Sequence, residues 1–189
     1  MRIEAKPVRA HPWYLKPFFW NQRRKYGEVL APALLWARNP MLFLCVAWLV
    51  GIFGRRSSPL PPSLRTLVMT RISQINHCAF CIDLNAATLQ KHGVTEVKIE
   101  ALAEWRASNQ FEDDERLALE YAEAVTRPDG RLDDPLFERL KNRFSEDAVV
   151  ELTALIAFQN MSSKFNSALG VPAQGFCRLP GAHSGQTTK

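Results

Sequence analysis

Apolar residues recur at helical spacing through most of the chain. After the proline-rich segment near residue 60 they follow the three-to-four-residue period of an amphipathic helix, at Leu64, Leu67, Val68, Ile72 and Ile75. Similar patterns predict further helices at 33–39, 41–53, 78–93, 94–105, 113–127, 135–144 and 146–170. No segment alternates convincingly between apolar and polar residues, and no hairpin signal appears. We therefore predict an all-α fold, a compact helical bundle of about six to eight helices.

Capping residues indicate where several of these helices begin. Asp113 or Asp114 is expected to cap the helix that follows it. Asp134 is expected to be an N-cap with Pro135 at the first helical position, where proline is well tolerated. Ser145 is expected to start the last long helix. That helix is apolar nearly all round, which predicts a central position or a subunit interface.

The chain is expected to divide at the turn-rich linker of residues 54–63. We predict an N-terminal extension at 1–57, a helical core at 58–180 and a loose polar tail at 181–189. Residues 1–26 are rich in aromatic side chains and interrupted by prolines, so we expect them to be irregular.

The segment 41–53 is the most hydrophobic part of the extension. A membrane-spanning helix needs about 20 apolar residues, so we predict no transmembrane span and a buried core helix here. A short interfacial or re-entrant segment is the alternative.

The positive charge is concentrated in the extension. The net charge of the chain is +5, with +8 in residues 1–57 and −3 in residues 58–189. Basic residues interleaved with aromatic ones can bind single-stranded nucleic acid, but no recognised nucleic-acid motif accompanies them. We therefore expect no nucleic-acid partner, and an arm that packs its rings on the body or on a neighbouring subunit.

Cysteine is sparse, with four residues in 189. This is too few for the disulfide framework of a small secreted domain, and no signal-peptide pattern is evident. Both observations favour a reducing compartment and a cytoplasmic location.

The strongest chemical signal is the Cys-x-x-Cys pair of Cys78 and Cys81. On a helix the two thiols lie on one face, one turn apart. Cys78 falls where the helix begins, and the partial positive charge there favours a thiolate. His77 adds positive charge when it is protonated. Once one cysteine is oxidised the other can resolve it, which predicts a dithiol–disulfide cycle with no cofactor and no metal.

Two other interpretations of the pair remain open. A structural zinc site needs four ligands, and the remaining histidines and cysteines show no ligand spacing. The two cysteines would otherwise be buried as small hydrophobic residues. Cys45 is expected in the core of the apolar helix, and the pattern assigns no role to Cys177.

The residues around the pair resemble a known family. The segments 60–65, 73–83, 122–126 and 144–170 are similar to the carboxymuconolactone decarboxylase superfamily, in its alkylhydroperoxidase D-like branch. The resemblance covers roughly residues 58–178 and leaves the extension outside. It implies an all-helical fold that assembles into trimers or hexamers. It also implies a thiol peroxidase of peroxiredoxin type, acting on a hydroperoxide or a disulfide, with a small thiol or a redox protein as reductant.

The resemblance also implies roles for the two cysteines. In the branch, the second cysteine usually attacks the peroxide and the first is the more exposed partner for exchange. That would make Cys81 peroxidatic and Cys78 resolving. The helix-start argument instead favours Cys78 as the thiol with the lower pKa, so the two roles stay open.

Two positions depart from the family motif. Thr66 stands where the family carries a glutamate, and Asn85 stands where it carries a histidine. Helical spacing places residue 85 one turn from Cys81, but neither side chain can act as a base at neutral pH. His77 is the possible substitute.

The favoured hypothesis is an alkylhydroperoxidase-like disulfide oxidoreductase with Cys78 and Cys81 as its redox pair. The alternative is a redox-responsive or structural helical oligomer that has lost efficient peroxidase activity, and whose basic arm engages a partner or an anionic surface. A carboxymuconolactone decarboxylase is a third hypothesis, less favoured because members with that activity generally lack the cysteine pair.

Overall fold

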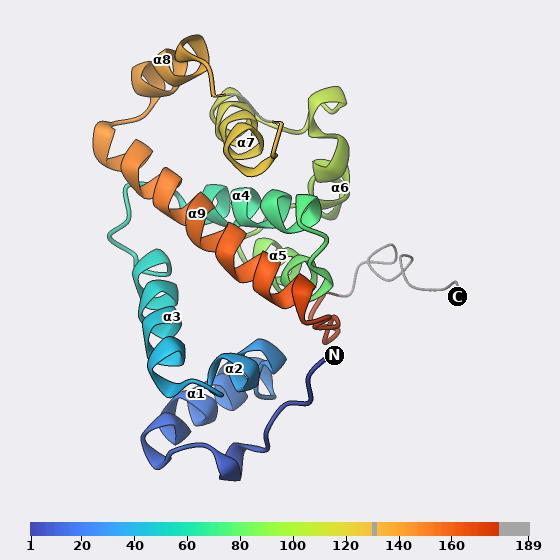
Figure 1. Cartoon of the computed structure of the whole chain (residues 1–189). Helices are drawn as coiled ribbons and strands as arrows, with labels where there is room; N and C mark the ends of the chain where they lie inside the picture. Colours follow the sequence, from blue (N-terminus) through green and yellow to red (C-terminus); the bar gives the residue numbers. More distant parts are fainter. Residues whose placement is uncertain (130–131, 178–189) are drawn as a thin grey trace. The chain divides into compact units, whose positions relative to one another are not determined.

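The computed structural model describes residues 1–129 and 132–177, and these residues are helical without any strand (Figure 1). The predicted all-α fold is confirmed. The described part of the chain contains nine α-helices, against the six to eight expected, together with three short 3₁₀ helices. It forms two compact units. Unit 1 comprises Met1–Arg55 with Leu169–Val171, and unit 2 comprises Arg56–Ala168 with the chain from Pro172. The predicted tail 181–189 lies outside the described residues.

Unit 1 is helical from near its beginning. The 3₁₀ helices Val8–Ala10 and Trp13–Leu15 precede α1 (Lys16–Tyr26), α2 (Ala31–Trp36) and α3 (Pro40–Phe53). The prediction of an irregular segment 1–26 is therefore wrong for α1. Pro17 lies in the first turn of α1, where the missing N–H has no intrahelical partner to lose. Gly27, with a φ of 84°, ends the helix in the left-handed conformation that glycine favours.

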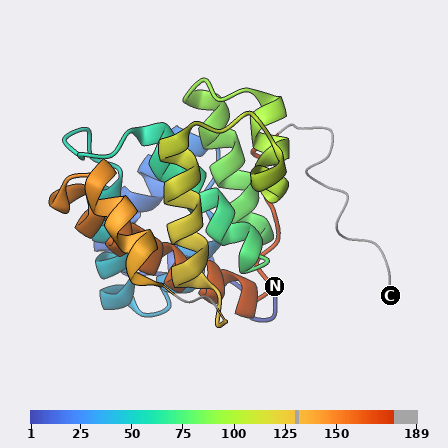
Figure 2. The ribbon, with the colours of Figure 1, turned by 90° about the horizontal axis from the view of Figure 1, so that it is seen from above.

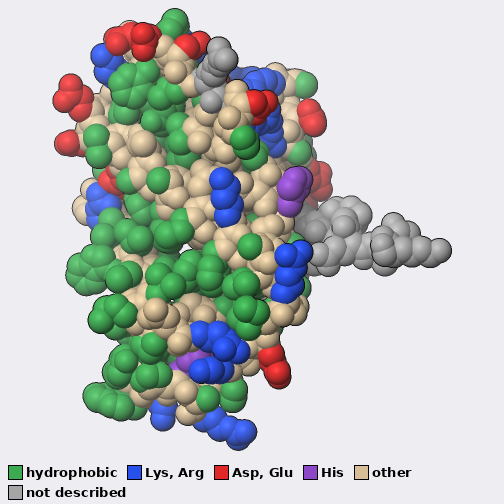
Figure 3. All heavy atoms as spheres, viewed as in Figure 1, with side chains coloured by type: hydrophobic (Ala, Val, Ile, Leu, Met, Phe, Trp, Pro, Cys, Tyr) green, Lys and Arg blue, Asp and Glu red, His purple; other side chains and the backbone are tan. Residues whose placement is uncertain are grey.

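Helix α3 is not the buried core helix that its composition predicted. Only Phe43 and Val46 of this helix are buried, while Met41 and Trp48 are 70% and 74% exposed. Figure 3 shows hydrophobic side chains gathered over α3. Because α3 is apolar on every side, its pattern gave no indication of which face packs. Among the described residues, no helix is both long and apolar enough to cross a membrane.

Unit 2 is built around α4 (Pro62–Ile75), which packs against α5 (Ala79–Lys91), α7 (Asp113–Thr126) and α9 (Glu146–Ala168) (Figures 1 and 2). Helix α8 (Asp134–Arg143) packs on α7 and α9. Buried apolar side chains of α4, α7, α8 and α9 form one cluster, which includes Val68, Ile72, Leu152 and Ile156. A second cluster joins α5 to the segment before α7.

The helix predicted over 94–105 is interrupted. It consists of α6 (Glu96–Glu100) and a 3₁₀ segment, η3 (Ala101–Ala107), in which Glu104 has non-helical dihedrals. Apolar spacing alone does not distinguish these two kinds of helix, since both place every third residue on a similar face.

Two of the predicted caps are off by one residue. Helix α7 is capped by Glu112, not Asp113 or Asp114, in a capping box in which Glu115 accepts a bond from the backbone N–H of Glu112 at 2.9 Å. Helix α8 is capped by Asp133, which accepts from the N–H of Leu136 at 2.9 Å. Asp134 is therefore the first helical residue. In both cases a neighbouring acidic residue competed for the same position.

The start of α9 agrees with its predicted cap. The N–H of Ala148 donates to the hydroxyl of Ser145 at 3.3 Å. The helix ends at Ala168, two residues before the predicted Gly170, which has a φ of 63°.

Candidate active site

A tight turn joins α4 to α5 and carries the first cysteine. The N–H of Cys78 donates to the carbonyl of Ser73 at 3.0 Å, and the N–H of His77 donates to the carbonyl of Gln74 at 3.1 Å. These two bonds form a Schellman motif, with His77 in the left-handed conformation at a φ of 51°. The motif ends α4, and the residue that follows it, Cys78, is the N-cap of α5.

Cys78 and Cys81 form a disulfide across the first turn of α5, with their Cα atoms 5.3 Å apart. The sulfur of Cys78 also accepts a hydrogen bond from the backbone N–H of Cys81 at 3.2 Å, as an N-cap side chain does. In the reduced protein this N–H and the positive end of the helix would both favour a thiolate on Cys78.

Both sulfurs lie below the surface of the described chain. Cys78 is 1% exposed and Cys81 is 5% exposed. The resemblance implied that the first cysteine is the more exposed of the two, and that expectation is wrong for this chain. Cys78 is covered because it is at once the last residue of the turn after α4 and the cap of α5, so both helices pack around it.

The three residues expected to support the cysteines are not hydrogen-bonded to either sulfur. Thr66 is buried in α4 and donates to the carbonyl of Pro62 at 2.8 Å. Asn85 donates to the hydroxyl of Ser73 at 3.3 Å. His77 has an exposed side chain, and its hydrogen bonds are made by its backbone, whose N–H donates to Gln74 and whose carbonyl accepts from Ser167 of α9. Among the described side chains, no ionisable group is hydrogen-bonded to the disulfide.

The side chain that contacts the disulfide was not among those predicted from the sequence. Asn166, near the end of α9, donates from its Nδ2 to the sulfur of Cys81 at 3.3 Å. Asn166 is 2% exposed, and its Oδ1 has no hydrogen-bond partner. It is the one described side chain outside the pair that is hydrogen-bonded to either sulfur.

Asn166 belongs to a buried polar stripe on α9. Gln159 donates to the hydroxyl of Ser73 at 2.8 Å, and Ser163 accepts from Asn76 at 2.8 Å. Gln159, Ser163 and Asn166 follow one another at spacings of four and three residues, so they share one face. The expectation that α9 is apolar nearly all round is therefore wrong. Polar residues recurring at helical spacing in an apolar helix were the signal that could have revealed this face.

A buried carboxyl group on α5 binds the segment that follows α9. Asp83 is buried in α5, two residues after the second cysteine. Its carboxylate accepts four backbone N–H bonds at 2.7–3.1 Å, from Gln174, Gly175, Phe176 and Cys177. Successive backbone amides turned toward one carboxylate form an anion-binding nest. This clamp, formed by the Asp83 carboxylate and the four amides, holds Cys177 in a buried position.

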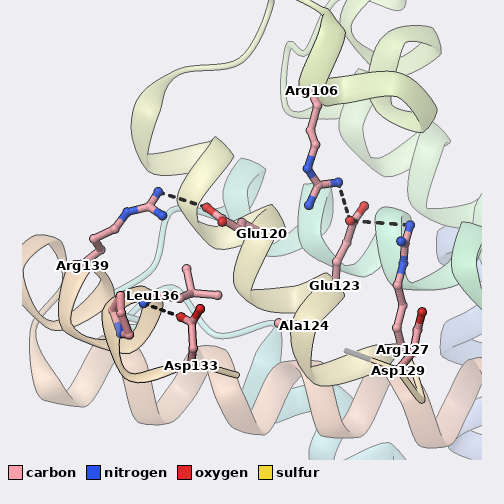
Figure 4. A pocket seen from close by; sticks show the side chains of 10 residues that line it. Arg106, Glu120, Glu123, Ala124, Arg127, Asp129, Asp133, Leu136 and Arg139 are labelled. Carbon is pink, nitrogen blue, oxygen red and sulfur yellow. Dashed lines mark hydrogen bonds and ion pairs between the residues drawn. The ribbon is translucent and has the colours of Figure 1, made fainter. Parts of the chain in front are cut away.

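A pocket of about 360 Å³ lies elsewhere in unit 2, and neither cysteine lines it (Figure 4). Its lining is charged and includes Arg106, Glu120, Glu123 and Arg139. Glu123 is 3% exposed. It accepts from Arg71 and Arg106 at 2.6 and 2.5 Å.

The same carboxylate accepts from the indole N–H of Trp105 at 3.0 Å. Burial alone would raise the pKa of Glu123, but the hydrogen bonds from Trp105, Arg106 and Arg71 outweigh burial and hold the pKa below its usual value. These bonds tie η3, α4 and α7 together, so we interpret Glu123 as a structural group. Within 1–129 and 132–177, no cluster of three or more metal-ligating side chains is gathered.

The family of the chain follows from comparison with known proteins. The model of the carboxymuconolactone decarboxylase family matches residues 32–124. This match begins inside the segment 1–57, which the resemblance had left outside. The uncharacterized protein YnjA of Escherichia coli (strain K12) is 46% identical over 174 residues, which cover 92% of this chain and 96% of YnjA.

Solved structures share the fold at lower sequence identity. A peroxidase-related protein from Ralstonia eutropha JMP134, described as an alkylhydroperoxidase AhpD core, has a TM-score of 0.82 and 20% identity, and 93% of each chain is covered. The debrominase Bmp8 in complex with 2,3,4-tribromopyrrole has a TM-score of 0.80 and 22% identity, again over 93% of each chain. The family-model match and the similarity to YnjA show that the chain belongs to the carboxymuconolactone decarboxylase family, and the solved structures share its fold.

Proposed function

We propose that the protein is a thiol-dependent, peroxidase-like disulfide oxidoreductase in which Cys78 and Cys81 cycle between dithiol and disulfide. The observation that carries the proposal is the disulfide between these two residues at the first turn of α5. Two sulfurs held at bonding distance at a helix start can take up and release two electrons without rearranging the backbone.

With a hydroperoxide as oxidant, the cycle has two steps. A thiolate attacks the terminal oxygen, so that an S–O bond forms, the O–O bond breaks, and the alkoxide leaves and takes up a proton to become an alcohol. The second thiol then attacks the oxidised sulfur, so that the S–S bond forms, the S–O bond breaks, and water leaves with the thiol proton. An external small thiol or redox protein returns two electrons and two protons.

The hydrogen bonds to the two sulfurs support a redox role for the cysteine pair. In the described part of the chain, they do not include a group that could transfer a proton efficiently. The N–H of Cys81 and the start of α5 favour a thiolate on Cys78, while Asn166 donates to the sulfur of Cys81. Thr66 and Asn85 carry no proton that titrates near neutral pH. We therefore expect slow turnover with hydroperoxides and faster exchange with disulfides.

We propose a homo-oligomer, a trimer or hexamer, located in the cytoplasm, where thiol reductants are abundant. The single-chain burial of both sulfurs implies that substrates reach them only when this part of the structure opens, or that small substrates are favoured.

The test counts thiols in protein that carries Cys45→Ser, because Cys45 is exposed and free and would otherwise react. Treating the reduced protein with a slight excess of hydroperoxide should remove two thiols per chain, and a dithiol reductant should restore them. Cys78→Ser and Cys81→Ser should each abolish the reversible loss. Because Bmp8 is a debrominase, a brominated pyrrole belongs in the substrate panel beside hydroperoxides and a model disulfide.

The same experiment distinguishes the second candidate, a redox-responsive or structural oligomer without catalytic turnover. The absence of an ionisable partner at the sulfurs, among the described residues, favours this candidate. A stoichiometric loss of two thiols without repeated turnover would support it over the peroxidase-like function. If Cys81→Ser kept the full activity of the parent protein, the proposed dithiol–disulfide cycle would be wrong.

A further inference from the structure

We propose that Asn166 controls the redox poise of the cysteine pair, stabilising the reduced form by donating to the sulfur of Cys81. This inference rests on the proposed function, since it names the residue that tunes the same pair. It also assigns to an uncharged amide the stabilisation of the sulfur that Thr66 and Asn85 do not supply.

The first observation is the contact itself. Asn166 Nδ2 lies 3.3 Å from Cys81 Sγ in a site that is almost completely closed to solvent. A disulfide sulfur is a weak acceptor, whereas a thiolate carries a full negative charge and accepts a much stronger, charge-assisted bond. The same N–H therefore contributes more to the reduced, ionised protein than to the oxidised one.

The second observation is the other end of the amide. Asn166 Oδ1 is buried and has no hydrogen-bond partner while the disulfide is present. A buried acceptor without a donor destabilises the state in which it occurs. Reduction to the form with Cys81 ionised adds two electrons and one proton to the pair, and this proton gives Cys78 an S–H donor that the disulfide lacks. Both ends of the amide therefore favour the reduced form.

The position of Asn166 is held by its helix. It lies one turn after Ser163, whose hydroxyl donates to the carbonyl of Gln159 at 2.6 Å and accepts from Asn76. The packing of α9 against α4 and α5 presents the amide of Asn166 to the sulfur, and the bonds of Ser163 lie one turn away from it. Ser163 shares this environment but makes no contact with sulfur, which makes it a matched control.

The experiment uses the full chain carrying Cys45→Ser and compares Asn166→Leu, Asn166→Asp and Ser163→Ala. The dithiol–disulfide equilibrium is measured against glutathione. Asn166→Leu should shift it about tenfold toward the disulfide, which corresponds to a potential about 30 mV more negative. Asn166→Asp keeps the shape but places a carboxylate beside the sulfur, and should shift the equilibrium in the same direction. Ser163→Ala should leave it unchanged.

A second measurement follows the thiolate directly. In a Cys45→Ser, Cys78→Ser background, the rate of alkylation of Cys81 by iodoacetamide is recorded against pH. Asn166→Leu should move the midpoint of this profile to higher pH by about one unit. Ser163→Ala should not move it.

The proposal is overturned if Asn166→Leu and Ser163→Ala give the same potential and the same alkylation profile. If Asn166→Leu does not fold, Asn166→Asp is the test. An unchanged potential in the aspartate variant also overturns the proposal. Failure of the proposed function has a different signature. In that case the potential and the alkylation profile still respond to Asn166, but no variant turns over hydroperoxide or disulfide.

Discussion

At the scale of single residues, Glu123 shows how much of the stability depends on contacts across elements. Its carboxylate is bonded to Arg71 in α4 and to Trp105 and Arg106 in η3, and Arg127 lies 3.6 Å from it. A buried carboxylate without these donors would be strongly destabilising. A glutamate in an amphipathic helix normally faces solvent, so its pattern in the sequence gave no reason to expect this arrangement.

Glu123→Gln should destabilise the protein by about 3 kcal/mol at neutral pH, because Arg71 is left buried without its counter-charge. The folded state lowers the pKa of Glu123. The stabilisation by the Glu123 carboxylate is therefore complete above pH 4.5, the pKa of the group in the unfolded chain. It is lost as the pH falls through the lower pKa of the folded state. The difference in unfolding free energy between parent and variant should shrink as the pH falls below about 4.5, as measured by urea denaturation at several pH values.

Glu120→Gln is the matched control for this experiment. Glu120 pairs with Arg139 at 3.0 Å, but both side chains are substantially exposed. Such a pair contributes at most about 1 kcal/mol. A Glu123→Gln effect that stayed constant from pH 7 to pH 3 would contradict the assigned ionic role.

At the scale of elements, the turn between α4 and α5 is the feature that positions the candidate site. The sequence predicted a helix through Leu64 and Ile75 and the start of the next helix at Cys78. The local signals were sufficient there because helix spacing and the immediate succession of two helices are both local properties. The partners of the sulfurs could not be predicted in the same way. Asn166 is 85 residues from Cys81, and only the packing of α9 brings it there.

Two helices differ from their predicted extents for physical reasons. Helix α1 was missed because prolines were counted as helix breakers, although Pro17 occupies a first-turn position where proline is compatible with a helix. The break between α6 and η3 was missed because the apolar spacing continues through it.

His77→Val should destabilise the protein by about 2 kcal/mol, because a β-branched residue is poorly suited to the left-handed conformation at φ 51°. His77→Gly is the control, since it removes the same exposed imidazole but adopts this conformation without strain. Thermal or urea unfolding would measure both variants. Equal destabilisation by valine and glycine would show that the imidazole itself, not the backbone conformation, is what the turn requires.

At the scale of the whole molecule, unit 1 combines a strongly basic segment with many exposed large apolar side chains. They include Trp13, Trp20, Met41 and Trp48. Exposed apolar side chains are concentrated on α3, which carries Met41 and Trp48, and such a concentration favours coverage by another surface. We propose that a second copy of this chain provides it, which agrees with the expected oligomer.

Trp48→Lys should weaken this assembly and shift the mass measured by light scattering toward the monomer, because it places a charge on the apolar surface of α3. Val97→Lys provides the comparison, since Val97 is 61% exposed on α6 and lies in the other unit. The oligomer interpretation fails for this surface if the parent protein is monomeric, or if both variants keep the mass of the parent.

The clamp formed by Asp83 has a kinetic consequence. Four consecutive backbone amides, those of residues 174–177, are held by one carboxylate. They will therefore exchange their hydrogens with solvent as one cooperative group and not one at a time. The carboxylate is carried by α5 two residues beyond Cys81. The exchange rate of these four amides thus reports on how often the segment 174–177 detaches from α5 close to the buried sulfurs.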